Sequence, residues 1–165
     1  VVDDGLVKKY LMEHLQVPDY QARASAAFAQ GNLGKAMRYA KSEDFIERKD
    51  HIISLLRHVE QMDLSEMLAV IKDLGTRKDE VRDYIDLMVL WYRDVLLFKA
   101  TKDINQLLFQ DEASYISREA SHRSYEKIEE ILQAFEKAKV RLRANVNFDI
   151  TMEVLFLSIK ERIKK

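Results

Sequence analysis

The chain has 165 residues, of which 47% are hydrophobic and 33% charged, and this balance excludes a disordered protein and allows one ordinary domain core. Its net charge of -1 gives no basic footprint for nucleic acid, and the lack of cysteine excludes disulfides, thiol nucleophiles and cysteine-ligated zinc. With only four glycines and one proline, the sequence predicts an all-α fold.

The N-terminus, VVDDGLVKKY, places acidic residues before basic ones and has no apolar stretch. It therefore predicts no signal peptide, and we expect a cytoplasmic protein. The longest apolar block, residues 85–100, is interrupted by Asp86, Arg93 and Asp94. These charges argue against a membrane span.

The first part of the chain predicts three short helices with tight connections. The first spans residues 3–15, and the second begins at Pro18 and is rich in alanine up to residue 30. Gly31 ends the second helix, and the third covers residues 33–41. Residues 1–44 therefore read as a compact helical module.

The next predicted helices are longer and carry more aromatic residues. One covers residues 42–61, and a shorter one covers residues 63–74. Thr76, followed by Asp79 three positions later, resembles a capping box that begins a central helix ending near Thr101.

The central helix contains the chain's only tryptophan, Trp91, and is apolar around most of its circumference. Such a helix needs partners on several sides, so we expect it to form the centre of a helical bundle. Arg93 and Asp94 lie within this surface and favour a polar seam facing solvent, with a contact across a subunit interface as the alternative. On the second reading, the candidate interface residues are Arg93, Asp94 and Phe98.

The last third of the chain predicts short helices from Asp103 and Asp111, followed by two longer ones. The first of these begins at Ser121 or Ser124 and ends near residue 144. Asn147 can cap the final helix. We expect that helix to pack through five apolar positions: Ile150, Val154, Leu155, Leu157 and Ile159. Met152 and Phe156 are expected on other sides of the helix.

Few residues suggest catalytic or metal chemistry. The glycines are scattered and form no phosphate-binding loop, so nucleotide hydrolysis by this chain is not expected. Glu47, His51 and His58 have helical spacing, but a solvated helix face explains them better than a metal site. We expect no catalytic residue, cofactor or metal in this chain itself.

The segment GNLGKAMRYA, residues 31–40, has the look of a tetratricopeptide unit. Such units need a copy about 34 residues later to bury their faces. The corresponding positions hold Ser65, Val70 and Asp73, and the repeat fails. A true repeat array is thus not expected. A stand-alone, tetratricopeptide-like helical scaffold that binds peptide or protein partners is kept as the second hypothesis.

Three motifs, in order, resemble the bacterial clamp-loader subunits of the delta-prime kind. The first is the alanine-rich helix followed by Gly31, Gly34 and Ala36, which resembles the end of the family's lid. The second is WYRDVLL, which begins at Trp91. The third is the segment in which paired asparagines precede a helix with a glutamate and a leucine-rich run; its family residues are Asn145, Asn147 and Glu153.

This resemblance implies a three-helix lid over residues 1–44 and a helical collar over residues 45–165. The collar is expected to pack against the delta and motor subunits of the DNA polymerase III clamp loader, without direct contact with nucleic acid or membrane. Motor subunits of this family carry a sensor arginine where this chain has Gly34. That difference implies a subunit that does not hydrolyse ATP itself, in a complex whose enzyme class is DNA-directed DNA polymerase.

Overall fold

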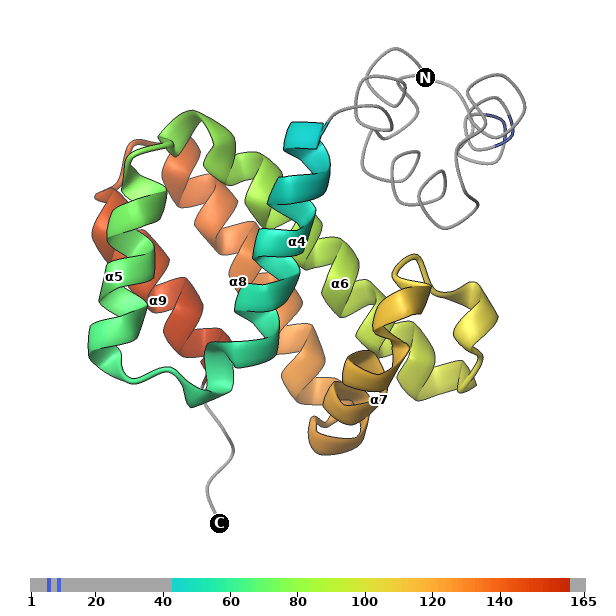
Figure 1. Cartoon of the computed structure of the whole chain (residues 1–165). Coiled ribbons are helices and arrows are strands. Elements are labelled where there is room, and N and C mark those ends of the chain that lie inside the picture. The colour runs from blue at the N-terminus through green and yellow to red at the C-terminus, as the bar shows by residue number, and fades with distance from the viewer. Residues whose placement is uncertain (1–5, 7–8, 10–42, 161–165) are drawn as a thin grey trace.

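The computed structural model describes Leu6, Lys9 and residues 43–160 (Figure 1). Apart from Leu6 and Lys9, the predicted three-helix module over residues 3–41, with Gly31, Gly34 and Ala36, lies outside the described residues. Within residues 43–160 the elements are helical and no strand occurs, which confirms the all-α prediction. In chain order they are α4 (Glu43–His58), η1 (Val59–Gln61), α5 (Leu64–Gly75), η2 (Lys78–Glu80), α6 (Val81–Thr101), η3 (Ile104–Gln106), η4 (Gln110–Glu112), α7 (Ala113–His122), α8 (Tyr125–Arg143) and α9 (Phe148–Lys160).

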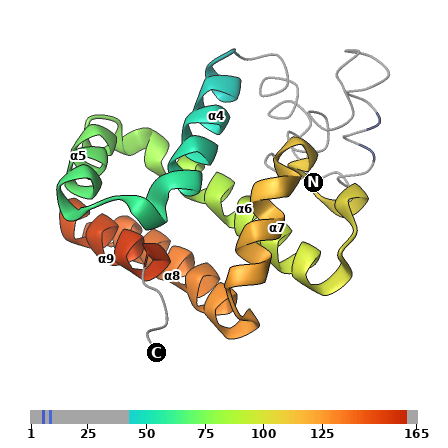
Figure 2. The same ribbon diagram turned by 60° about the horizontal axis from the view of Figure 1, so that its bottom comes forward.

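Helix α6 forms the centre of the bundle, as predicted. It packs against α4, α7 and α8, while α9 packs against α8 and α5 (Figures 1 and 2). Trp91 is 1% exposed, and Ile85, Met88, Tyr92 and Val95 are fully buried. Each such side chain contributes about 1.5–3 kcal/mol through its burial, so α6 supplies a large part of the core stability.

The helix starts follow local hydrogen bonding, with one correction. Asp63 and Glu66 form a reciprocal capping box at α5, and the Ser124 hydroxyl accepts the Lys127 N–H at the start of α8. The predicted capping box at Thr76 is wrong. Thr76 has αR backbone angles, and its hydroxyl donates to the Asp73 carbonyl, so it closes α5 and α6 begins only at Val81.

The two family asparagines have separate backbone roles. Asn145 has a φ of 59°, the left-handed conformation that ends a helix, and its N–H donates to the Leu142 carbonyl at 3.2 Å. The Val146 N–H donates to the Arg141 carbonyl at 3.0 Å and completes a Schellman motif. The Asn147 side chain then accepts the Ile150 N–H at 3.0 Å, which confirms its predicted capping role at α9.

The buried face of α9 agrees with the prediction at Leu155 and Ile159 and differs from it at the other positions. Met152, Leu155, Phe156 and Ile159 are at most 1% exposed and form the inner face. Three predicted packing positions face outward, with exposures of 58% for Ile150, 44% for Val154 and 48% for Leu157. Because α9 is apolar around most of its circumference, its sequence pattern did not select the face that α5 and α8 cover. In the described part of the chain, no helix is long and apolar enough to cross a membrane.

Candidate functional site

Asp94 is a buried internal anchor. Its side chain is on α6, it is 2% exposed, and its carboxylate accepts the Leu108 N–H at 3.1 Å and the Phe109 N–H at 2.8 Å. Phe109 is itself buried, and its ring lies 5.9 Å from the ring of Trp91 between centroids. The predicted solvent-facing seam therefore does not extend to Asp94. Its role at an interface between subunits stays a prediction, and its observed contacts favour an internal role.

The other two candidate interface residues reach the surface. Arg93 is exposed, one position before the buried Asp94. Phe98 is partly buried, and the Lys102 ammonium lies 5.8 Å from its ring centroid. Nothing in the described residues shows a partner for this surface, so the interface assignment of Arg93 and Phe98 stays a prediction. Trp91 lies in the core, and its Nε1 has no hydrogen-bond partner among the described residues.

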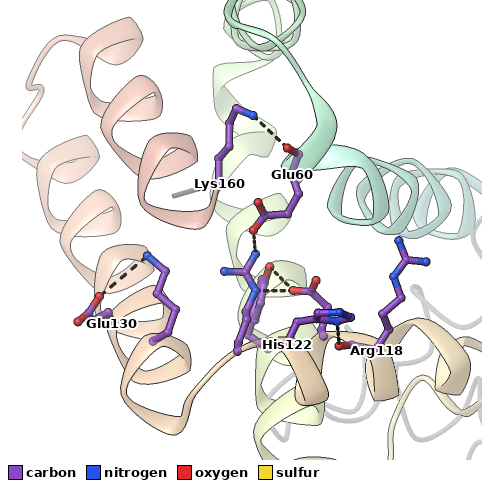
Figure 3. A network of polar contacts seen from close by, with 9 residues as sticks. Glu60, Arg118, His122, Glu130 and Lys160 are labelled. Carbon is purple, nitrogen blue, oxygen red and sulfur yellow. Dashed lines mark hydrogen bonds and ion pairs between the residues drawn. The ribbon is translucent and has the colours of Figure 1, made fainter. Parts of the chain in front are cut away.

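A second buried polar group, which we call the Arg123 cluster, joins four parts of the bundle (Figure 3). The Arg123 side chain is 5% exposed; its Nε donates to Glu119 at 2.6 Å, and its terminal nitrogen pairs with Glu60 of η1. The Tyr92 hydroxyl on α6 donates to Glu119 at 3.4 Å. Lys160, at the end of α9, donates to the Glu60 carbonyl at 3.0 Å. The cluster therefore links η1, α6, α7 and α9 through charge-assisted hydrogen bonds.

Burial determines the protonation state of the cluster's tyrosine. Because the site excludes water and holds the carboxylates of Glu119 and Glu60 nearby, the pKa of Tyr92 lies far above its ordinary value. The hydroxyl therefore stays protonated and acts as a donor. Sequence reasoning missed this cluster because Glu60 and Arg123 are 63 positions apart. Only the spacing of four between Glu119 and Arg123 was a local signal.

The residues considered for metal binding lie on the surface. Glu47 and His51 are exposed on α4 and line a shallow pocket with Arg48 and Glu80, which form an ion pair at 3.1 Å. His58 is exposed, and its Nδ1 lies 2.7 Å from the Ser54 carbonyl oxygen. Among the residues that the structure describes, no group of three His, Asp or Glu side chains could hold a metal ion.

The C-terminal helix carries an exposed apolar feature, the α9 stripe, which we define as Ile150, Val154 and Leu157. These residues are spaced by four and then three positions, so they share one side of α9. A groove of about 240 Å³ runs beside the stripe, between α8 and α9. Figure 2 shows these two helices side by side. The groove is lined by Lys127, Glu130, Gln133, Ala134, Lys137, Ala138, Arg141, Val154, Leu155 and Ser158.

Three cations of α8 line the groove: Lys127, Lys137 and Arg141. We call the last two, Lys137 and Arg141, the α8 rim. Lys127 is already paired with Glu130 at 4.0 Å. In contrast, neither rim cation has an ion-pair partner within residues 43–160. The surface therefore combines an apolar stripe with unpaired positive charge, a combination suited to contact with another protein.

Comparisons with known proteins agree with the resemblance found in the sequence. The family model described as DNA polymerase III, delta subunit, C terminal, matches residues 42–161. The chain is 25% identical over 164 residues to DNA polymerase III subunit delta′ of Bacillus subtilis (strain 168), a match that covers 97% of this chain and 47% of that protein. The chain thus spans about half the length of this curated relative. No solved structure matches the chain. The chain therefore belongs to the family formed by the C-terminal domains of DNA polymerase III delta subunits, and it resembles the C-terminal region of a delta-prime subunit of DNA polymerase III.

Proposed function

We propose that this chain is a non-catalytic assembly module of the DNA polymerase III clamp loader. Residues 1–44 serve as a lid, and residues 45–165 form a collar that packs against sister subunits and so supports loading of the sliding clamp. The partners are the delta subunit and the motor subunits. The observation that supports this most strongly is the family match over residues 42–161, on a bundle with an exposed apolar helix face.

The placement of the polar groups supports an assembly role over a catalytic one. Asp94 and Arg123 are the most deeply buried charged residues in the described part of the chain, and both are occupied with contacts inside the fold. Asp94 holds the segment after α6, and Arg123 holds η1 and α7. These contacts organise the helices, and the exposed side chains are left to make contacts with partners.

The direct test is assembly with sister subunits. The full 165-residue chain, the delta subunit and a motor subunit of the same organism are mixed at micromolar concentration. Size-exclusion chromatography with light scattering then measures the mass of each peak, and each protein run alone serves as the control. We expect a peak whose mass equals the sum of the partners. Independent migration of all components would refute the assembly role.

The gene sequence upstream of Val1 gives a second test, which separates this proposal from a stand-alone peptide-binding scaffold. The resemblance to delta-prime subunits implies that this upstream sequence encodes a nucleotide-binding-like domain with four cysteines. A gene that encodes no such domain would favour the scaffold.

A further inference from the structure

The α9 stripe is apolar surface that α9 does not use for packing within the bundle. The inner face already buries Met152, Leu155, Phe156 and Ile159 against the bundle. The stripe occupies the other side of the same helix, at a spacing that one partner helix can contact along its length. Exposed apolar side chains arranged in this way mark contact surfaces, whereas scattered ones do not.

The groove beside the stripe favours a protein partner over a small molecule. Its volume of about 240 Å³ lies below the roughly 300–1,000 Å³ typical of small-molecule pockets. Its lining includes the small side chain of Ala134 and Val154 of the stripe. Side chains of a neighbouring helix can enter such a groove while the helix itself lies on the stripe.

The charges decide which partner fits. Lys137 and Arg141 lie four positions apart on α8, so both point to the same side of that helix. Lys127 has Glu130 as an ion-pair partner, whereas Lys137 and Arg141 have none within residues 43–160, so the rim carries unpaired positive charge. An interface gains specificity when the opposite sign meets such a rim. A second copy of this chain in an isologous contact would instead bring the same cations to the interface from both sides.

We infer that the α9 stripe and the α8 rim together receive one amphipathic helix of a sister clamp-loader subunit. That helix has apolar residues at steps of three and four against Ile150, Val154 and Leu157, and acidic residues on one flank against Lys137 and Arg141. The inference rests on the proposed assembly function and assigns it to a particular surface.

The test uses the same sister-subunit mixture, with the full chain carrying single substitutions. Val154→Glu and Leu157→Glu place a charge on the stripe, and Leu64→Glu on α5 is the matched control, because Leu64 is also apolar and 60% exposed. Circular dichroism and thermal unfolding check that each variant folds. We expect Kd to rise at least about tenfold for the stripe variants and less than about twofold for the control.

Charge-reversal variants test the contribution of the α8 rim. The double variant Lys137→Glu with Arg141→Glu should raise Kd by about threefold to tenfold, whereas Lys137→Arg should leave Kd unchanged. Added salt should weaken binding of the unmodified chain more than binding of the double variant. Equal salt dependence of the two proteins would overturn the assignment of an acidic partner.

The outcomes separate this inference from the proposed function. If the unmodified chain assembles and the stripe variants still bind normally, the surface is wrong and the assembly role stands. If Leu64→Glu weakens binding as much as Val154→Glu, the surface is also wrong. Sedimentation of the chain alone tests whether a second copy of this chain occupies the surface instead. A dimer that Val154→Glu abolishes would assign the surface to that second copy and overturn the inference. If the unmodified chain binds no sister subunit, both proposals fail.

Discussion

The carboxylate of Asp94 accepts the backbone N–H of Phe109 at 2.8 Å, 15 positions along the chain. Its other oxygen accepts the neighbouring N–H of Leu108. A single side chain of α6 thus fixes the segment that returns the chain to α7. The bond also positions the Phe109 ring beside Trp91, so an acidic residue in the middle of an apolar helix stabilises the core around it.

Replacing Asp94 should destabilise the fold strongly. Asp94→Ala leaves two backbone N–H groups without their acceptor in a buried site, and we expect the free energy of unfolding to fall by about 2–4 kcal/mol. Urea denaturation followed by circular dichroism measures this. Arg93→Ala is the matched control, because Arg93 is exposed, and its effect should stay within about 0.5 kcal/mol. A similar effect of both variants would contradict the anchoring role.

Removing Arg123 should cost more than removing an exposed charge. Arg123→Ala leaves the carboxylates of Glu60 and Glu119 without their common partner, and breaking a buried ion pair typically costs about 3–5 kcal/mol. Restoring charge balance with Arg123→Met and Glu60→Gln together should recover part of this loss. A double-mutant cycle in urea measures the coupling between Arg123 and Glu60. Additive effects of the two single variants would show that the pair does not interact.

The raised pKa of Tyr92 predicts a loss of stability in alkali. The ordinary tyrosine pKa is near 10.0, and burial raises that of Tyr92 in the folded state. The stabilisation that Tyr92 contributes is therefore complete below about pH 10, and it is lost as pH rises further, since only the unfolded chain ionises there. Tyr92→Phe should flatten the decrease of unfolding free energy above pH 10, and urea unfolding at several pH values measures this slope. If the unfolding free energy of the two proteins fell equally with pH above pH 10, ionisation of Tyr92 would not be the cause of the decrease.

The two asparagines before α9 should tolerate different substitutions, glycine at position 145 and serine at position 147. Asn145→Gly should be neutral or stabilising, because Asn145 has a positive φ, while Asn145→Ala should cost about 1 kcal/mol. Asn147→Ala should cost about 1 kcal/mol through loss of the cap to Ile150, and Asn147→Ser should retain most of the stability. Thermal unfolding compares the four variants. If glycine were no better than alanine at position 145, the backbone explanation would fail.

Elements that depend on nearby residues could be predicted from the amino-acid sequence. The scarcity of glycine and proline indicated an all-α fold, and the caps formed by Asp63, Ser124 and Asn147 lie within a few positions of the N–H groups that they accept. The order of short motifs was also enough to indicate the family. Local hydrogen bonding therefore makes helix starts predictable. Thr76 shows the limit, because its hydroxyl closes the preceding helix instead of opening the next one.

Packing between distant segments selected which of several apolar or charged residues face inward. The pattern of α9 allowed Val154 or Met152 to pack inside, and the positions of α5 and α8 selected Met152. Asp94 and Arg123 were likewise assigned only when segments distant in sequence came together. Periodicity describes one helix at a time, whereas burial depends on which neighbours cover it. The exposed α9 stripe, and with it the candidate interface, could therefore be found only in the assembled bundle.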